Sequence, residues 1–470
     1  MNRLLISAAH KSSGKTTLSI GLCAALRVRG HAVQPFKKGP DFIDPMWLSL
    51  AAGRDCLNLD FYLMGRDEIL RNFVEHSRGA ELSLIEGNKG LYDGLSLDGS
   101  NSNAALATLL DAPVVLVIDA RGMTRGIAPL ILGYQAFDRH IRIAGVILNQ
   151  LGGSRHESKL RAVIEHYTDV PVLGAVHRDD HLAIVERHLG LMPSNEATEA
   201  RAKIDAIASR VAASVDLDRL IEVSSGAPAL TVAAAEIAGS PAAPRADVKI
   251  GIARDAAFAF YYPGDLRALR AAGAELVTID TLRDSALPEV DALLIGGGFP
   301  EIFMEQLEAN VSLRRQIRQA IEGGMPAYAE CGGLMYLSRS LSWRGKRCEM
   351  TGVIPGDIVM HERPMGRGYV LLRETGRNPW PRQAPAHGPV EVRAHEFHYS
   401  SVENLPADTV YAYDVLRGTG VDGKHDGIVH KNLFACYAHL RDLEDNHWTA
   451  RFVDFIRERR RSAGKQQAVV

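Results

Sequence analysis

A segment near the start of the chain requires a strand that turns directly into a helix. Residues 9–17 read Ala-His-Lys-Ser-Ser-Gly-Lys-Thr-Thr and stand between an apolar run and a helical run. They fit the G-x-x-x-x-G-K-[ST] pattern of a P-loop, with Ala9 in place of the first glycine. In such a loop, backbone amides and a helix N-terminus bind phosphates, the lysine neutralises their charge, and the hydroxyl binds Mg²⁺. The residues expected to bind nucleotide phosphates are Ser12, Ser13, Gly14, Lys15, Thr16 and Thr17.

The rest of the first half repeats the alternation of apolar and helical runs. This pattern is typical of a parallel β-sheet covered by helices, and it predicts an α/β fold. The expected strands are Leu4–Ile6, Val33–Phe36, Leu82–Ile85, Val114–Ile118 and Gly145–Leu148, with helices at Thr16–Arg29 and Asn103–Leu110.

Composition changes near the middle of the chain. Residues 224–247 are rich in Ser, Gly, Ala and Pro, as in a linker, and a second α/β alternation follows. Its expected strands are Lys249–Ile252, Glu275–Ile279, Ala292–Ile295 and Pro326–Ala329. With 470 residues, enough for two or three domains, we expect a first domain over 1–223 and a linker over 224–247. A second domain is expected over 248–445, with a C-terminal helix and polar tail over 446–470.

The overall composition excludes several classes of protein. Hydrophobic residues make up 46% and charged residues 23%, as in ordinary globular proteins, and the net charge of −2 predicts no nucleic-acid or membrane partner. No stretch of 18 apolar residues appears. The five cysteines have no CxxC spacing, which argues against a disulfide framework or a zinc site and favours a cytoplasmic protein.

Two acidic loops follow predicted strands of the first domain. Asp41 lies in the loop 36–45, and Glu86 and Asp93 lie in the loop 86–94. The carboxyl ends of parallel strands meet at one edge of the sheet, so these carboxylates are expected to reach the γ-phosphate and its metal ion. Asp beside Gly or Pro also forms turns, which is the simpler structural role.

A second strand that turns directly into a helix lies in the second domain. Residues 326–335 read Pro-Ala-Tyr-Ala-Glu-Cys-Gly-Gly-Leu-Met, which places Cys331 at the bend. A cysteine there is a candidate nucleophile, and the following glycines leave room for amides to face an oxyanion. The alternative is a buried cysteine that only packs.

Several motifs together closely resemble the cobyrinic acid a,c-diamide synthase family over nearly the whole chain. They occupy residues 9–17, 37–45, 86–94, 296–301, 329–333, 363–369, 393–400 and 432–440. The resemblance implies a dethiobiotin-synthetase-like parallel-sheet domain, which acts as an ATP-dependent amide ligase. It also implies a class I glutamine amidotransferase-like α/β domain after it. The implied reaction uses ATP, Mg²⁺ and glutamine to amidate the a and c acetate groups of a tetrapyrrole such as cobyrinate.

The resemblance also assigns roles to residues of the first domain. ATP would convert a tetrapyrrole carboxylate into an acyl phosphate that ammonia can attack, with Lys15 and Lys37 stabilising the transferred phosphoryl group. The residues implied in activation are Asp41, Glu86, Asp93 and Lys37, and those implied in binding magnesium are Thr16, Glu86 and Asp41.

In the second domain the resemblance makes Cys331 the nucleophile that releases ammonia from glutamine and His439 its base. The implied oxyanion donors are the amides of Gly297, Gly298 and Gly332. Amidotransferases with a complete triad carry Glu two residues after the His, where this chain has Arg441. A Cys-His dyad, or a triad with another third group, is therefore expected.

Other interpretations stay open at this point. Asn88-Lys89 and the segment 46–49 differ from residues usual in the family, which leaves sirohaem or sirohydrochlorin as alternative substrates. A P-loop switch ATPase with an inactive amidotransferase appendage is an alternative from another class. His395 and His398 are expected to have a structural or cleft role instead of binding metal. A homodimer is compatible with the sequence.

Overall fold

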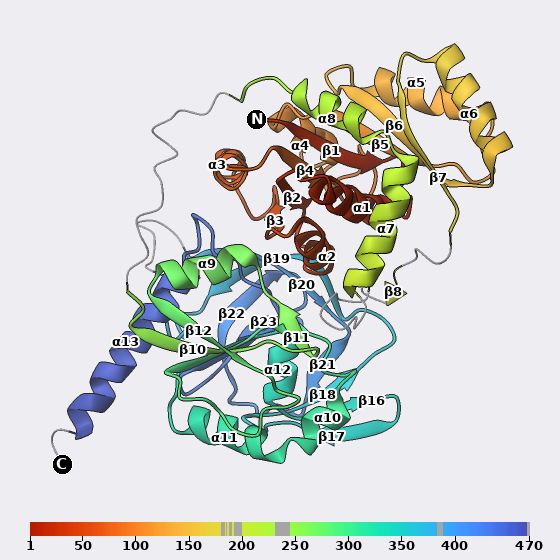
Figure 1. The fold of residues 1–470 in the computed structure, drawn as a ribbon. Helices are drawn as coiled ribbons and strands as arrows, with labels where there is room; N and C mark the ends of the chain where they lie inside the picture. The colour runs from red at the N-terminus through yellow and green to blue at the C-terminus, as the bar shows by residue number, and fades with distance from the viewer. Residues whose placement is uncertain are drawn as a thin grey trace. The chain divides into compact units, whose positions relative to one another are not determined.

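The computed structural model describes residues 1–179, 200–230, 245–382 and 389–467, together with residues 184, 186–187 and 190–191. The chain divides into two compact units, Met1–Gly239 and Ser240–Val470, and each is described by itself (Figure 1). Most of the predicted linker, residues 231–244, lies outside the described residues, and its first two residues end a helix of the first unit.

The first unit is built on a seven-stranded sheet with the order β3-β2-β4-β1-β5-β6-β7. All neighbouring strands run parallel. The strands are β1 Arg3–Ala8, β2 Val33–Lys38, β3 Leu57–Leu59, β4 Leu82–Glu86, β5 Val114–Asp119, β6 Ile143–Leu151 and β7 Val172–His177. The central strands are buried along their whole length, which explains why they appear in the sequence as continuous apolar runs. The five predicted strands are confirmed, while β3 and β7 were not predicted.

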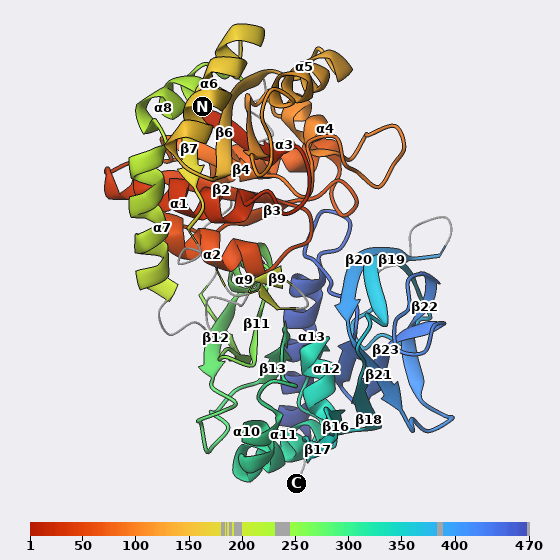
Figure 2. The same ribbon diagram turned by 90° about the vertical axis from the view of Figure 1, so that its right-hand side faces the viewer.

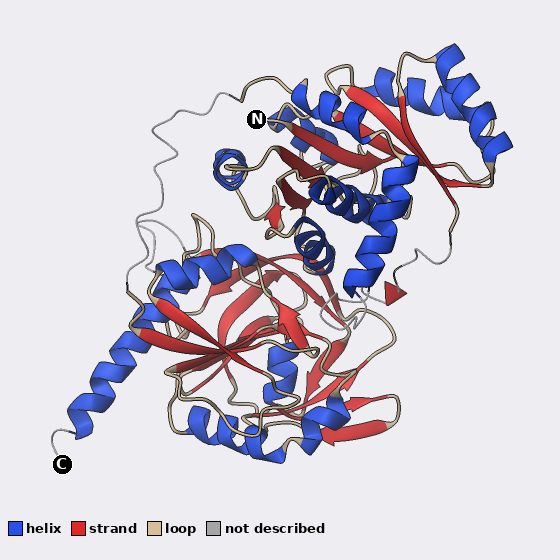
Figure 3. Cartoon of the chain, viewed as in Figure 1, coloured by secondary structure: helices blue, strands red, loops and turns tan. Residues whose placement is uncertain are grey.

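Helices cover the faces of this sheet (Figure 3). They are α1 Lys15–Val28, α2 Ile43–Ala52, α3 Arg66–His76, α4 Asn103–Leu109, α5 Ile127–Phe137, α6 Ser154–Tyr167, α7 Ala200–Ser214 and α8 Leu217–Ser225. Helices α1, α2 and α7 lie side by side (Figures 1 and 2). A Cβ added at Gly21 of α1 would lie 2.5 Å from Val211 Cγ2 of α7, so the glycine permits this close approach. The short strands β8 Glu186–Arg187 and β9 Gly190–Leu191 pair antiparallel.

The second unit contains a nine-stranded mixed sheet with the order β12-β10-β13-β15-β24-β23-β22-β19-β20. Pairs from β12 to β24 are parallel, and pairs from β24 to β20 are antiparallel. The strands are β10 Val248–Ala253, β12 Ala274–Ile279, β13 Ala292–Ile295, β15 Ala327–Glu330, β19 Gly366–Glu374, β20 Glu391–His398, β22 Val410–Arg417, β23 His425–His430 and β24 Leu433–Cys436. The predicted strands correspond to β10, β12, β13 and β15, whereas β24 and the antiparallel strands were not predicted.

Smaller elements complete this unit. Two short sheets pair β11 Phe258–Phe260 with β14 Gly297–Gly298, and join β16 Ser338–Trp343, β17 Lys346–Glu349, β18 Ile354–Met360 and β21 Ser400–Glu403. The helices are α9 Pro263–Ala271, α10 Met304–Ala309, α11 Val311–Glu322, α12 Gly332–Leu337 and α13 Trp448–Gln467. The start of α13 belongs to the core, because Trp448 and Phe452 are buried and Trp448 packs 4.9 Å from the ring of Tyr328.

A close backbone contact at Gly333 gives a test of this packing. A Cβ added there would lie 2.0 Å from the carbonyl oxygen of Ile295, a backbone atom that cannot move aside. We expect Gly333→Ala to lower the free energy of unfolding by about 3 kcal/mol. Gly264→Ala in α9 is the control, because a Cβ at Gly264 has no heavy atom within 4 Å, and it should change stability by less than about 1 kcal/mol. Urea unfolding measures the stability of both variants, and equal midpoints for the two would contradict the prediction.

Candidate active sites

The P-loop connects β1 to α1, and its shape depends on a glycine. Gly14 has a left-handed backbone with φ of 85°. A Cβ at this position would lie 2.2 Å from Nδ2 of Asn149, an amide at the end of β6 that donates to the carbonyl of Ser13 at 2.9 Å. Gly14 therefore allows Asn149 to hold the loop where α1 begins.

The six residues predicted to bind phosphate form one continuous turn into this helix. Ser12 has a positive φ of 63°, and the buried Ser13 hydroxyl donates to the carbonyl of His10 at 2.8 Å. Lys15 is the first residue of α1, followed by Thr16 and Thr17. Burial lowers the pKa of Lys15, against the opposing effect of Glu86.

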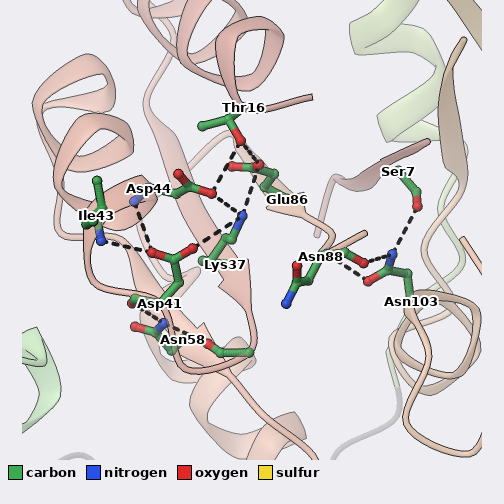
Figure 4. Close-up of polar contacts among 11 residues, drawn as sticks. Ser7, Thr16, Lys37, Asp41, Ile43, Asp44, Asn58, Glu86, Asn88 and Asn103 are labelled. Carbon is green, nitrogen blue, oxygen red and sulfur yellow. Dashed lines mark hydrogen bonds and ion pairs between the residues drawn. The ribbon is translucent and has the colours of Figure 1, made fainter. Parts of the chain in front are cut away.

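A polar cluster lies beside the P-loop at the carboxyl ends of β2 and β4 (Figure 4). Lys37 and Glu86 face each other in the register of these strands, and Lys37 Nζ lies 3.0 Å from Glu86 Oε1 and 2.5 Å from Asp44 Oδ2. The Thr16 hydroxyl donates to Glu86 Oε1 at 2.6 Å and to Asp44 Oδ2 at 3.3 Å. The cluster therefore links the P-loop to both acidic loops.

The structure places the predicted carboxylates in different roles. Asp41 Oδ1 accepts the amides of Ile43 and Asp44 at 2.9 and 3.2 Å, while its Oδ2 lies 3.9 Å from Lys37 Nζ. Asp93 is exposed, and its Oδ2 accepts the amide of Gly90 at 2.9 Å. Asp41 thus borders the cluster while it accepts the first two amides of α2, and Asp93 has the geometry of a turn former.

Asp44 was missed as a site residue, although it makes two of the cluster's contacts. Its position in the same acidic segment as Asp41, in the first turn of α2, could have indicated it.

The electrostatics of the cluster favour a further positive charge. Burial opposes the charge of Lys37, but Asp44, Glu86 and Asp41 outweigh it and raise the pKa of the lysine. Burial also raises the pKa of Glu86, since Lys37 only partly compensates. Glu86 is fully buried, and its Oε2 has no hydrogen-bond partner in the described structure. A buried acceptor of this kind calls for a ligand that is not part of the protein.

The chemistry of the cluster fits Mg²⁺. Within the described ranges, no three His, Cys, Asp or Glu side chains form a metal site by themselves. Mg²⁺ is commonly held by only one or two carboxylates together with substrate phosphates and water. The hydroxyl of Thr16, the free oxygen of Glu86 and the carboxylate of Asp44 satisfy that pattern.

Two asparagines that the sequence did not reveal hold the acidic loops. Asn58 donates to the carbonyls of Gly39 and Asp41, each at 2.8 Å. Asn103 donates to the carbonyls of Asn88 and Gly90 at 2.8 and 2.7 Å and accepts the amide of Asn88 at 2.9 Å (Figure 4). Each side chain supplies hydrogen-bond partners that the backbone of its loop would otherwise lack.

The second site forms where β15 turns into α12. Cys331 stands at the bend with φ of 47° and ψ of −101°, and it is 6% exposed. Such a conformation is unfavourable for a residue with a Cβ and is found at nucleophile turns. His439, just after β24, lies beside it, because an interaction with the Cys331 thiol contributes to the histidine's pKa. The structure therefore brings together the predicted nucleophile and base.

Glu330 also contacts His439. Its Oε2 lies 3.3 Å from His439 Nδ1, and its Oε1 accepts the amide of Leu440 at 2.9 Å. Burial lowers the affinity of His439 for a proton, but the Cys331 and Glu330 side chains outweigh it and raise the pKa of His439 to about 10. The ring of His395 stacks on that of His439, with centroids 4.9 Å apart.

The three glycines predicted as oxyanion donors lie around this pair. A Cβ at Gly297 would lie 2.7 Å from His439 Cε1, and a Cβ at Gly332 would lie 3.0 Å from the amide nitrogen of Gly298. The absence of side chains at these positions lets the backbone approach the nucleophile closely.

Comparison with known proteins agrees with the division of the chain into a P-loop unit and a second unit that contains Cys331. Residues 5–191 match the model of a CobQ/CobB/MinD/ParA nucleotide binding domain, and residues 249–447 match that of a CobB/CobQ-like glutamine amidotransferase domain. The chain is 48% identical over 97% of both chains to a cobyrinate a,c-diamide synthase of Magnetococcus marinus. It is 41% identical to one of Methanosarcina barkeri, over 98% of this chain and 97% of that protein.

The fold and the two sites define a glutamine-dependent carbon–nitrogen ligase, with a nucleotide-binding domain followed by an amidotransferase domain. Within this class the chain belongs to the cobyrinate a,c-diamide synthase family. The predicted fold class and enzyme class are confirmed, and the alternative of a switch ATPase is not supported. In the described parts of the chain, no helix is both long and apolar enough to span a membrane.

Proposed function

We propose that the protein amidates the a and c acetate groups of cobyrinate, using ATP and glutamine. For each group, a carboxylate, ATP, glutamine and water become a carboxamide, ADP, phosphate and glutamate. A carboxylate is a poor acyl donor, so it must be activated before ammonia can attack it. The observation that carries the proposal is the P-loop cluster of Thr16, Lys37, Asp44 and Glu86, with its unpartnered buried oxygen.

In the activation step, a carboxylate oxygen of the substrate attacks the γ-phosphorus of ATP, and ADP leaves. Lys15 and the loop amides bind the phosphates, while Lys37, held between Asp44 and Glu86, stabilises the charge on the transferred group. Ammonia then attacks the carbonyl carbon of the acyl phosphate, and phosphate leaves.

Mg²⁺ would be held by Thr16, Glu86 and Asp44, with Asp41 at the border of the cluster. When bound, it neutralises negative charge on the phosphates of ATP.

Ammonia comes from glutamine in the second unit. The thiolate of Cys331 attacks the carboxamide carbon, His439 supplies the proton that lets ammonia leave, and a glutamyl thioester remains. Water then hydrolyses the thioester, which releases glutamate and restores the thiol. The amides of Gly297, Gly298 and Gly332 are the proposed donors to the oxyanion of both tetrahedral intermediates.

The choice of cobyrinate follows the two relatives described above, which are named for that substrate and are 48% and 41% identical to this chain. It is tested by incubating the protein with ATP, Mg²⁺, glutamine and one of three tetrapyrroles: cobyrinate, sirohydrochlorin or sirohaem. We expect cobyrinate to lose about 2 Da by mass spectrometry, since each conversion of acid to amide lowers the mass by about 1 Da. Amidation of sirohaem or sirohydrochlorin in its place would contradict the proposed substrate, and no mass change on any of them would contradict the proposed function.

A further inference from the structure

The glutaminase site contains a carboxylate at a different place in the sequence from the glutamate of complete amidotransferase triads. Arg441 stands two residues after His439, whereas Glu330 directly precedes the nucleophile. Side chains alternate along a strand, so Glu330 and Cys331 leave β15 in different directions. Glu330 Oε2 nevertheless lies 3.3 Å from His439 Nδ1, because β15 and β24 are neighbours in register.

We infer that Glu330 is the positioning residue of the glutaminase site. Its carboxylate holds His439 with Nδ1 protonated, which leaves Nε2 to exchange a proton with Cys331. The site is then a triad whose carboxylate comes from the nucleophile's own strand. This inference rests on the proposed release of ammonia by Cys331.

Glu330 is itself held in place on its other side. Its Oε1 accepts the amide of Leu440 at 2.9 Å and the hydroxyl of Tyr328. Burial raises the pKa of Tyr328, so its hydroxyl remains a donor. The Tyr328 ring stacks on Phe434 with centroids 5.2 Å apart and lies 4.9 Å from Trp448. The carboxylate is therefore anchored to the core of the second unit and cannot swing away from His439.

The other groups near His439 do not replace this carboxylate. His395 stacks on it from β20, but burial lowers the pKa of His395 well below the usual value, so that ring is neutral. Arg441 carries a positive charge and lies over the ring of Tyr262, 5.1 Å from its centroid. Besides the Cys331 thiol, Glu330 is the group that favours the imidazolium against burial.

The test is Glu330→Gln, assayed by glutamate release from glutamine without a tetrapyrrole. The glutamine oxygen can still accept the amide of Leu440 and the hydroxyl of Tyr328, so the fold is kept. Its amide group would face Nδ1 and favour the histidine tautomer that cannot take a proton from the thiol. We expect kcat to fall about 100-fold or more with KM changed less than about threefold, and the alkaline limb of the pH profile to move down by about one to two units.

Matched variants separate this role from a structural one. Glu330→Asp keeps the charge and should retain the wild-type alkaline limb with a smaller loss of kcat. Glu349→Gln, whose side chain is 80% exposed in the same unit, should behave as wild type. Synthesis with ammonium salts should persist in Glu330→Gln, and an unchanged urea-unfolding midpoint should show that the second unit is folded.

Two results would overturn the inference: a Glu330→Gln enzyme with kcat within threefold of wild type, or a loss of kcat with an unmoved alkaline limb. Because glutamate release needs no tetrapyrrole, failure to amidate cobyrinate would contradict the proposed substrate and leave the role of Glu330 intact.

Discussion

Cys331→Ser is expected to abolish amidation with glutamine while amidation with ammonium salts continues. The serine hydroxyl is a far weaker nucleophile than a thiolate, so glutamine hydrolysis should fall by about 10³-fold or more. Cys331 lies in the second unit, whereas the P-loop cluster lies wholly in the first, so carboxylate activation should survive. Glutamate release measures glutamine hydrolysis, and amide formation with glutamine or with ammonium salts measures carboxylate activation.

Cys348→Ser is the matched control for this experiment. Cys348 is also a buried free thiol of the second unit, but it lies on β17, away from the strand–helix bend. We expect its substitution to leave both activities nearly unchanged. Glutaminase activity retained in Cys331→Ser would refute the nucleophile assignment, and a variant that ammonium cannot rescue would show that the two sites do not act independently.

Glu86→Gln is expected to have the opposite pattern: loss of amidation with either nitrogen source and retention of glutamine hydrolysis. The fully buried carboxylate accepts from Thr16 at 2.6 Å and lies 3.0 Å from the Lys37 ammonium. An amide would remove the charge that orients Lys37 and the free oxygen proposed to bind Mg²⁺. We expect amide formation to fall about 10³-fold and the Mg²⁺ concentration for half-maximal activity to rise.

Glu81→Gln is the control, because Glu81 lies just before the opposite end of the same strand, and its side chain is 59% exposed. It should amidate at the wild-type rate. If Glu86→Gln amidated with ammonium as fast as the wild type, the polar cluster would not be the site of activation.

Both sites could be found in the sequence because each is a continuous segment with a local signature. The turn at Gly14 and the bend at Cys331 each join one strand to one helix, so a few adjacent residues determine their shape. The role of His439 was predicted only from the resemblance to a family, since nothing in its local sequence places it beside Cys331, 108 positions earlier.

Glu330 and Asp44 were not predicted, for related reasons. The contact of Glu330 with His439 spans 109 residues and depends on the pairing of β15 with β24. Asp44 contacts Thr16, 28 residues earlier in the chain, because the first turn of α2 follows β2 after a short loop. The antiparallel strands β19 and β20 were missed because polar and charged residues interrupt their apolar positions.

The positive φ at Cys331 has a consequence for how such sequences diverge. Holding a residue with a Cβ in this conformation costs about 1–3 kcal/mol, and glycine would not incur that cost. The most stabilising substitution at this position is therefore one that destroys the nucleophile. A lineage that obtained ammonia from another source should drift toward glycine here, while its P-loop stays intact. A cysteine in this conformation is what a requirement for its thiol would retain against the gain in stability from glycine.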